Sequence, residues 1–586
     1  MFLAVVFAIA AACSIAGGAL VRRLAPASGA VVPPRPDRWH RIPTPTLGGV
    51  AIVAGTIAGF AAVVFWPALI GAPAEWLPVP LAALAMFVVG VLDDRLQLSP
   101  LAKLVASLAI GAFLVFALAG AEPDGALPSV YTLVATVWFA GICHAMNLLD
   151  NMDGLAAGVG LIAALFLAAL LAGFLGPTLV VLLTALAGAL LGFLYWNRSR
   201  ARLFMGDCGS LFIGGLLAAA SLVPVYNAPL AFINPAVIVA LILIVPLFDT
   251  GFVLVLRRLA GLKATKGGTD HVSHRLVSLG FSERSAVRIL YLLGLVGGAT
   301  AWLLLWGRGV EPMLPLVAVF AVLVVLLGIY LARVPAYDAE DFIALQKSSF
   351  APLLKDLAFR WHAAEVMLDF ILIAVCYYIA YRLRFEGEDL DNFLPYFTAS
   401  LPVVLGCQLA ALYGSGLYQR SWETFGLRDL TSVLRGVGIG SVASVIATTY
   451  VYRLEGFSRA VFVLDALLLG VAIVATRASF RAMNLVAATR SKHSSRVLVY
   501  GAGAFGQTLV REMRANTMWN MNPVAFIDDD PMKARRWIVG VRVRGTIDDL
   551  QGTLRRCAVD EVVLSSPSIN GSVERRIREI CAQMER

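Results

Sequence analysis

The stretch NLLDNMDG, residues 147–154, separates two long apolar runs, 131–143 and 155–173. It carries two carboxylates, Asp150 and Asp153. Acidic residues between apolar runs of membrane length mark a membrane boundary, where ionisable groups are costly unless they serve a function. If the stretch is helical, carboxylates three residues apart share one face and could bind a divalent cation or a proton. A polar loop that only caps two helices is the alternative.

The composition is that of a polytopic membrane protein. The chain has 586 residues, of which 59% are hydrophobic and only 15% are charged, whereas soluble domains carry about a quarter charged residues. The net charge of +9 comes without a basic run that would predict a nucleic-acid partner. The seven cysteines lack the paired spacing of a disulfide framework or a zinc site.

Apolar runs long enough to cross a membrane divide the chain into domains. The first group occupies 1–20, 48–70, 78–92, 101–120, 128–146, 155–174, 177–195, 209–224, 233–256, 286–306 and 312–333. The second group occupies 365–383, 395–414, 432–451 and 459–476. We therefore expect a polytopic α-helical membrane protein with about 11 + 4 transmembrane helices and a soluble α/β tail. The predicted domains are 1–335, a cytoplasmic linker 336–364, a four-helix membrane domain 365–480, and 494–586.

The basic residues predict the orientation. Arg22 and Arg23 follow the first apolar run, which suggests an uncleaved helix with its N-terminus outside. Alternating the spans from there places the basic loops inside, whereas the outside loops 71–78, 121–128 and 226–235 contain no Lys or Arg. The polar stretches that interrupt the apolar runs then all face the cytoplasm, as the positive-inside rule requires.

Two of these stretches carry further carboxylates. LDDR (92–95) holds Asp93 and Asp94, which repel each other and coexist most easily beside a cation; Lys103 follows about two helical turns later. FMGDCGS (204–210) places Asp207 between two glycines at the start of a helix, an arrangement that suits magnesium and an approaching anion. The alternatives are a solvated helix end and a glycine-rich turn.

GGTDHVSHRL (267–276) supplies the remaining polar groups. His271 and His274 are three residues apart, beside Arg275. Two histidines and an arginine could grip a diphosphate or a sugar. A zinc pair and a solvated basic loop are the alternatives, although no cysteine or third histidine accompanies the pair.

Over roughly residues 1–335 the motifs resemble the polyprenyl-phosphate N-acetylhexosamine-1-phosphate transferases. DRWHRIPTPTLGG (37–49) is similar to the first cytoplasmic loop of that family, and LDDRLQLSPLAKL (92–104) to its paired-aspartate motif with the following lysine. NLLDNMDGLAAG, FMGDCGS and DHVSHRL are similar to its central aspartate, magnesium-aspartate and histidine motifs. The chain departs from the family pattern at Asn151, Cys208 and Ser273, and the last of these bears on which sugar is bound.

The resemblance implies a reaction in which a UDP-sugar and polyprenyl phosphate give polyprenyl-diphospho-sugar and UMP, initiating cell-surface glycan synthesis at the bacterial cytoplasmic membrane. It implies Mg²⁺ as cofactor, with Mn²⁺ as the alternative ion. The implied catalytic residues are Asp93, Asp94, Asp150, Asp153 and Asp207. The implied substrate-binding residues are Lys103, Asn147, His271, His274 and Arg275. The implied metal ligands are Asp207, Asn147 and Asp150.

The sequence of the tail, residues 494–586, predicts a Rossmann-like domain. RVLVYGAGAFGQTLVREM (496–513) predicts strand, glycine turn and helix, and VAFIDDD and DEVVLSS predict further strands. The residues that match a nucleotide-binding fingerprint are Gly501, Gly503, Gly506 and Asp528. With its four preceding spans, the tail resembles the N-terminal part of membrane-bound nucleotide-sugar epimerase/dehydratases. No tyrosine follows Tyr500, so the tail lacks the Tyr-Lys pair with which such an oxidoreductase transfers a proton, and we expect an assembly or regulatory module. The domain could bind a nucleotide, or it could be empty and serve homo-oligomer contacts.

Two other functions compete with the transferase. A transporter of the same lipid would be expected to carry polar groups at mid-membrane depth or broken helices, whereas the polar groups here gather at one face. A membrane-anchored sugar-nucleotide oxidoreductase would need a Tyr-Lys pair that the tail lacks.

Overall fold

The computed structural model describes most of the chain. The described residues are 1–26, 31–32, 43–65, 76–119, 129–172, 177–226, 233–259, 270–306, 310–332, 357–385, 388–419, 426–453, 457–490, 495–515, 519, 521–530, 532–565 and 571–583. Among them, 11 helices are long and apolar enough to span a membrane, or 12 if one bent pair is a single span. The expected polytopic α-helical fold is therefore confirmed. The chain divides into two compact units, residues 1–477 (unit 1) and 478–586 (unit 2).

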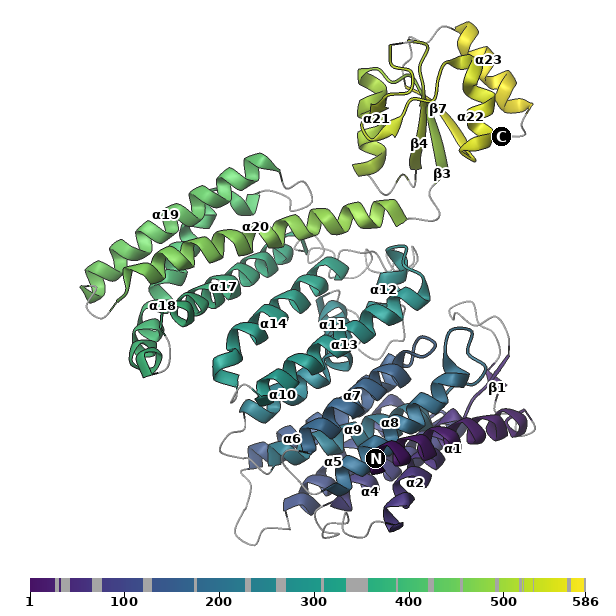
Figure 1. Cartoon of the computed structure of the whole chain (residues 1–586), viewed down its shortest axis with the longest axis vertical. Coiled ribbons are helices and arrows are strands. Elements are labelled where there is room, and N and C mark those ends of the chain that lie inside the picture. The colour runs from purple at the N-terminus through teal and green to yellow at the C-terminus, as the bar shows by residue number, and fades with distance from the viewer. Residues whose placement is uncertain are drawn as a thin grey trace. The chain divides into compact units, whose positions relative to one another are not determined.

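Each apolar run of the first group forms at least one helix (Figure 1). The helices are α1 (Phe2–Leu24), α2 (Gly48–Ala61, followed by the 3₁₀ turn Ala62–Phe65), α4 (Pro78–Leu96), α5 (Pro100–Ala119), α6 (Ser129–Leu149), α7 (Leu155–Leu171), α8 (Pro177–Asn197), α9 (Gly206–Tyr226), α10 (Ile233–Ile242), α11 (Ile244–Leu259), α12 (Val272–Ser278), α13 (Glu283–Trp306) and α14 (Val310–Ala332). A short ladder pairs β1 (Val31–Val32) with β2 (Thr44–Pro45).

Helix α9 is the centre of this group. It packs against α2, α4, α6 and α7, and 89% of its spanning window is buried inside the protein. Between its first turn and Tyr226 its sequence is apolar on every side apart from Ser221, as expected of a helix with no lipid-facing side. The first turn carries Asp207, so the most enclosed helix of the bundle presents its one acidic group at its start.

The run 233–256, which the sequence predicts as one span, is instead a pair of helices. α10 and α11 meet at a bend of 81°. Pro246 lies four residues after Ile242 and has no N–H to donate to the Ile242 carbonyl, so the helical ladder is interrupted there. The bend redirects α11, which carries Asp249.

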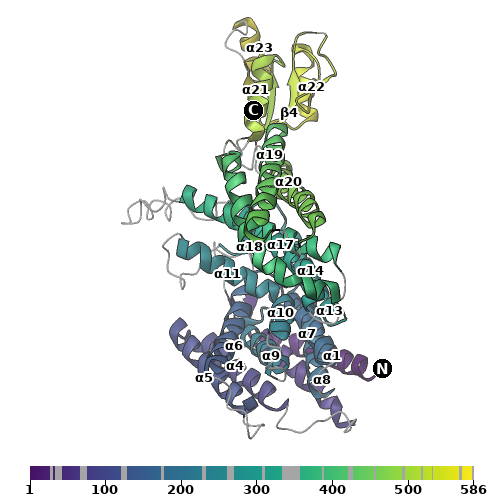
Figure 2. The same cartoon turned by 90° about the vertical axis from the view of Figure 1, so that its left-hand side faces the viewer.

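The second group of apolar runs forms four helices that lie together as a bundle (Figures 1 and 2). They are α17 (Leu357–Arg384), α18 (Glu388–Gly414), α19 (Leu427–Tyr452) and α20 (Arg459–Arg490), with a 3₁₀ turn at Leu417–Gln419. Arg477 on α20 makes two hydrogen bonds of 2.6 and 2.7 Å to Asp369 on α17, and both side chains are buried. Most of the predicted linker 336–364 lies outside the described residues.

Unit 2 contains the expected Rossmann-like elements. Three parallel strands in the order β4-β3-β7 form its sheet: β3 (Ser495–Tyr500), β4 (Met521–Ile527) and β7 (Glu561–Leu564). Helix α21 (Ala504–Ala515) lies on one side of the sheet, and α22 (Leu550–Arg556) and α23 (Gly571–Ala582) lie on the other (Figure 1). An antiparallel hairpin of β5 (Trp537–Ile538) and β6 (Val541–Arg542) completes the unit, with a 3₁₀ turn at Ile547–Asp549.

Glycines set the distance between α4 and α9, which gives a test of the packing. A Cβ atom added at Gly90 would lie 2.4 Å from the Cα of Cys208, whereas one added at Gly141 on α6 would meet nothing within 4 Å. We expect Gly90→Ala to destabilise the protein by about 1–3 kcal/mol through overpacking. Gly141→Ala should be neutral or slightly stabilising, since alanine favours helix by up to ~1 kcal/mol over glycine.

Thermal unfolding of the two variants in detergent would measure this difference. Equal midpoints for Gly90→Ala and Gly141→Ala would show that α4 and α9 are not held at the observed distance.

Candidate active site

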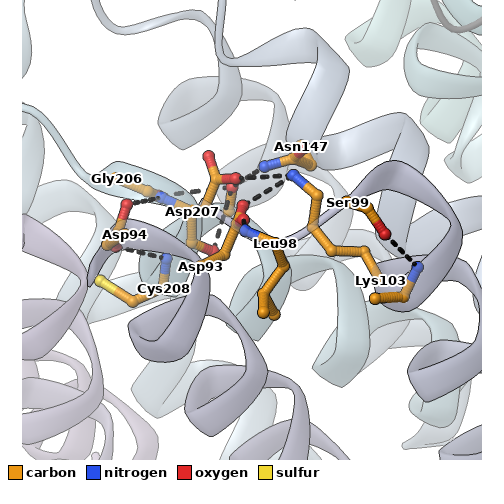
Figure 3. A network of polar contacts seen from close by, with 11 residues as sticks. Asp93, Asp94, Leu98, Ser99, Lys103, Asn147, Gly206, Asp207 and Cys208 are labelled. Carbon is orange, nitrogen blue, oxygen red and sulfur yellow. Dashed lines mark hydrogen bonds and ion pairs between the residues drawn. The ribbon is translucent and has the colours of Figure 1, made fainter. Parts of the chain in front are cut away.

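Three helix ends bring opposite charges together. Lys103, in the first turn of α5, places its Nζ 2.6 Å from Oδ2 of Asp93 at the end of α4 and 3.2 Å from Oδ2 of Asp207 at the start of α9 (Figure 3). The side chains of Asp93, Lys103 and Asp207 are 7%, 19% and 35% exposed, respectively. Asp93 thus lies at the back of the cluster and Asp207 at its open side, with the ammonium between them.

The neighbouring carboxylates of Asp93 and Asp94 point to different partners, which relieves their repulsion. Asp93 accepts a hydrogen bond from the amide of Leu98 (2.8 Å) in addition to its ion pair with Lys103. Asp94 accepts hydrogen bonds from the amides of Asp207 (2.9 Å) and Cys208 (3.0 Å). These amides belong to the first turn of α9, whose orphan donors and positive dipole end favour an anion.

Glycines allow this close approach. Gly206 has φ +70°, and a Cβ there would lie 2.8 Å from Oδ2 of Asp94. A Cβ on Gly49 would lie 2.3 Å from the amide nitrogen of Gly209, and the amides of Gly48 and Gly49 donate to Phe204 and Met205 (both 2.8 Å). The sequence predicts that Gly206 and Gly209 let a ligand approach; in the structure Gly206 lies against Asp94 and Gly209 against Gly49 at the start of α2.

The central stretch lies against the same cluster through Asn147. Its Nδ2 donates to the hydroxyl of Ser210 (2.9 Å), one turn into α9, and its side chain also hydrogen-bonds the Asp207 carboxylate. Figure 3 shows Asn147 beside Asp207 and Lys103. Asp150 follows immediately, with its amide 3.3 Å from the Asn147 carbonyl.

Residues 150–154 form turns and not a helix, so Asp150 and Asp153 do not share a helical face as the sequence had allowed. Asp153 accepts the amide of Ala201 (2.8 Å) from the connection between α8 and α9. Gly154 is fixed twice: its amide donates to Asn197 (2.9 Å), and its carbonyl accepts the hydroxyl of Tyr291 (2.6 Å). The stretch is therefore attached to α8 and α13.

The histidine motif forms the short helix α12 and its preceding turn. His271 Nδ1 lies 2.8 Å from Oδ2 of Asp249, whose Oδ1 accepts the amide of Val272 at the same distance. The hydroxyl of Ser273 donates to Asn151 (2.8 Å). This last contact joins α12 to the central stretch, so the two motifs are adjacent in space although 122 residues apart in the chain.

The other residues of the motif are more enclosed than the sequence suggests. Arg275 is 2% exposed and donates to the backbone carbonyls of Asp270 and Leu331, which connects α12 with the end of α14. Arg257 grips Asp270 with two hydrogen bonds of 2.6 and 2.7 Å. Burial would raise the pKa of Asp270, but the hydrogen bonds and charge of Arg257 lower it.

His274 is buried beside His271, with ring centroids 6.4 Å apart. Burial, reinforced by the neighbouring His271, lowers the pKa of His274 from 6.5 to about 4. The ring is therefore neutral at pH 7 and offers a hydrogen-bond donor and an acceptor, without a full positive charge.

The side chains near Asp207 fit a metal ion that takes only some of its ligands from the protein and the rest from a substrate. Among the described residues no three His, Cys, Asp or Glu side chains converge into an all-protein metal cage. Mg²⁺ usually takes only one or two carboxylates and completes its shell with water and phosphate oxygens. Asp207, the most open carboxylate of the cluster, and the amide of Asn147 are hard donors of that type.

In unit 2 the nucleotide fingerprint adopts the expected strand, turn and helix. Gly501 has φ +97°, and a Cβ on Gly506 would lie 1.9 Å from the carbonyl oxygen of Gly501, so both glycines are required by the turn. A Cβ on Gly503 would meet nothing. Asp528 accepts the amide of Ala502 (2.6 Å), so its carboxylate is engaged by the protein's own glycine turn.

Lys533 adds a second partner for Asp528, with its Nζ 3.2 Å from Oδ2. Although partial burial opposes ionisation, the amides of Asp530 and Ala502 and the side chain of Lys533 lower the pKa of Asp528.

Four residues around the site were missed by sequence reasoning. Asn197 and Tyr291 fix the central stretch, Asp249 holds His271, and His144 lies 3.0 Å from the hydroxyl of Ser107, one turn after Lys103. Asp249 and His144 carried a usable signal, since each is a lone ionisable residue inside an apolar run.

The chain is similar to known proteins in two regions. The profile of glycosyl transferase family 4 matches residues 76–225, and that of a CoA-binding domain matches residues 415–586. The decaprenyl-phosphate N-acetylglucosaminephosphotransferase of Mycolicibacterium smegmatis is 34% identical over 346 residues, which cover 54% of this chain and 85% of that protein.

Two further relatives have comparable similarity. The protein of the same name from Mycobacterium tuberculosis H37Rv is 36% identical over 48% of this chain and 77% of its own length. A phospho-N-acetylmuramoyl-pentapeptide-transferase from Synechococcus is 36% identical over 44% of this chain and 79% of its own length.

The structure predicts different consequences for the neighbouring aspartates. Replacing Asp94 by alanine removes both acceptors at the start of α9 and should cost about 1–2 kcal/mol of stability, as for other helix N-terminal caps. Asp207→Asn keeps the size of a partly exposed side chain and leaves Asp93 to pair with Lys103, so it should change the unfolding midpoint little. Unfolding in detergent would compare them; a larger loss for Asp207→Asn would contradict the capping role of Asp94.

The lowered pKa of His274 predicts acid sensitivity. The unfolded state binds a proton near pH 6.5 and the folded state only near pH 4, so stability is complete above pH 6.5 and falls as pH decreases between these values. The loss should be on the order of 2 kcal/mol. Unfolding midpoints from pH 7 to 4.5 should fall less steeply for His274→Gln than for the parent protein or a Ser278→Ala control; identical slopes would contradict the prediction.

Proposed function

Because the chain belongs to glycosyl transferase family 4, we propose that it transfers an N-acetylhexosamine-1-phosphate from a UDP-sugar to polyprenyl phosphate. An oxygen of the lipid phosphate attacks the phosphorus that bears the sugar, the bond to the UMP phosphate breaks, and the products are polyprenyl-diphospho-sugar and UMP. The single observation that carries this proposal is the cluster of Asp93, Lys103, Asn147 and Asp207 at the start of α9. Such transfer depends on positioning and neutralising charge more than on covalent catalysis.

Asp207, Asn147 and Asp150 would hold Mg²⁺, with Mn²⁺ as the alternative ion. When bound, the ion supplies neutralisation of the diphosphate charge. The support is the chemistry of two side chains. Asp207 has a carboxylate at the open side of the cluster, Asn147 has an amide that hydrogen-bonds it, and both groups contain the hard oxygen atoms that Mg²⁺ prefers.

Lys103 offers the cation nearest these donors. Its ammonium is shared between Asp93 and Asp207, and a phosphate that enters on the open side would compete with Asp207 for it. Asp93 lies behind Lys103 and would orient it or accept the proton of the lipid phosphate. Asp94 would act indirectly, because both of its oxygens already bind the amides of α9.

The histidine motif would face the sugar or the nucleotide. His271 is oriented by Asp249. His274 is neutral at pH 7, so its ring is suited to hydrogen bonding more than to ion pairing. Asp153 and Arg275 would contribute by fixing the loops, since Asp153 accepts the amide of Ala201 and Arg275 donates to backbone carbonyls. The link between Ser273 and Asn151 would connect sugar recognition with the central stretch.

The protein is an integral membrane protein with many apolar helices, and its site would face the cytoplasm, where basic loops concentrate and UDP-sugars are made. Unit 2 would serve as an assembly or regulatory module and not as a second enzyme. Gly501, Gly503 and Gly506 keep the form of a nucleotide turn, but Asp528 is held by Ala502 and Lys533. Nucleotide binding there would require this carboxylate to exchange partners.

Purified protein with undecaprenyl phosphate and UDP-N-acetylglucosamine should release UMP and form a lipid-linked product of the corresponding mass. Asp207→Asn should reduce turnover at least ~10²-fold, the scale of charge-positioning groups in active sites. Asp548→Asn, an exposed carboxylate in unit 2, is the matched control and should retain activity.

Two results would contradict the proposal. One is the absence of UMP release with any UDP-sugar tested, from protein that unfolds cooperatively. The other is turnover of Asp207→Asn within tenfold of the parent with an unchanged magnesium titration, which would remove Asp207 from the reaction.

A further inference from the structure

The β5–β6 hairpin of unit 2 has one face against the core and one face in solvent. Val541 and Val543 are 3% and 0% exposed and belong to the core packed against the sheet. Side chains alternate along a strand, and the residues between and beyond these valines, Arg542 and Arg544, are exposed. Trp537 pairs with Arg542 across the hairpin and is 69% exposed.

Arg535 joins the same outward face. The amide of Val543 donates to the carbonyl of Arg536, and the amide of Arg535 donates to the carbonyl of Val543. Arg535, which has φ +65°, and Arg536 therefore both lie opposite Val543, as at a β-bulge, and the side chain of Arg535 is exposed beside the hairpin. The outward face, defined here as Arg535, Trp537, Arg542 and Arg544, thus combines three guanidinium groups with an indole.

Nothing in the described part of the chain neutralises this face. None of its three arginines forms an ion pair with a described residue, whereas the neighbouring acid Asp530 is paired with Lys533 (3.5 Å). Met532, five residues before Trp537 in the chain, is also a large apolar residue and is 72% exposed. Exposed cations around an exposed tryptophan are the composition that favours the interface of an anionic bilayer.

The chain holds unit 2 close to a membrane. The spanning window of α20 ends at Met483, and the helix continues for seven more residues to Arg490, about 10 Å. β3 begins at Ser495, five residues after Arg490, a separation that an extended chain can span over at most ~18 Å. The sheet therefore begins within about 30 Å of the spanning segment, which keeps the local concentration of bilayer surface high.

The hairpin also points toward this attachment. Phe526 on β4 bridges Val543 in parallel, so residues before Val543 lie beside residues before Phe526. The hairpin turn at Val539–Gly540 is therefore directed toward the end of the sheet where β3 and β4 begin. Ser495, the residue at which the chain arrives from α20, is at that same end.

We propose that the outward face of the β5–β6 hairpin docks unit 2 onto anionic phospholipid of the leaflet from which α20 emerges. The three arginines bind lipid phosphates, and Trp537 enters the headgroup layer. Each basic residue near such a surface contributes a factor of about five in the docking equilibrium, so three of them hold the unit on the bilayer for most of the time. Salt weakens the contact because the charges lie at the surface.

Arginine footprinting of the full-length protein tests this docking. The protein is placed in nanodiscs of phosphatidylglycerol or phosphatidylcholine and treated with phenylglyoxal, and the modification of each arginine is followed by mass spectrometry. We expect Arg535, Arg542 and Arg544 to react at least about fivefold more slowly in phosphatidylglycerol, the factor for one cation. Arg555 and Arg556, exposed on α22, serve as internal references and should react equally in both lipids.

Variants separate docking from general charge. In Arg542→Glu/Arg544→Glu, the protection of Arg535 should disappear, and in Trp537→Ala it should weaken. The matched control Arg555→Glu/Arg556→Glu carries the same charge change on α22 and should leave Arg535 protected. Equal modification in the two lipids would overturn the proposal, and so would protection that persists in detergent, because a protein surface would then be covering the face.

Discussion

Asp94 binds the two amides that open α9, and the arrangement of the polar cluster follows from this contact. A carboxylate at a helix start satisfies orphan N–H donors and meets the positive end of the helix dipole. With Asp94 oriented this way, the adjacent Asp93 must point elsewhere, and it meets Lys103 on α5. Asp207, the second residue of α9, is thereby held opposite Asp93 with the lysine between them. Two neighbouring acids in a membrane protein are tolerated because each has a separate partner.

Close packing of the helices allows Asp94 to reach the amides of α9. Lipid chains are as apolar as the helices, so helix association in a membrane relies on small residues that let backbones approach. Gly49, Gly90 and Gly206 each lie where a Cβ would collide with the start of α9 or with Asp94. The same glycines that allow α2 and α4 to pack on α9 therefore also bring Asp94 within hydrogen-bond distance of the amides. Packing and electrostatics at this site cannot be varied independently.

Much of this could be predicted from the sequence, because hydropathy and motif spacing report on local constraints. Each apolar run forms at least one helix, and the fingerprint around Gly501 forms a strand, a turn and a helix. The bend at Pro246 was missed because a proline within an apolar run can also be accommodated without a sharp break. The different roles of Asp93 and Asp94 could not be predicted either, because these roles depend on which of the two adjacent side chains faces α9. Likewise, the partner of His271 lies 22 residues earlier, beyond any local pattern.

Both units contain a carboxylate that binds backbone amides at or just before the start of a helix, but the surroundings of this carboxylate differ. In unit 1 Asp94 binds amides at the start of α9, and in unit 2 Asp528 binds the amide of Ala502, just before α21. In both places the sequence pattern suggests a carboxylate aimed at a ligand, and in both the carboxylate closes the protein's own turn. The difference lies beside it. Asp207 remains partly open next to a lysine in unit 1, whereas Lys533 closes the second side of Asp528 in unit 2. A motif therefore identifies a helix start that can receive an anion, and the neighbouring charges decide whether a ligand or the chain itself supplies it.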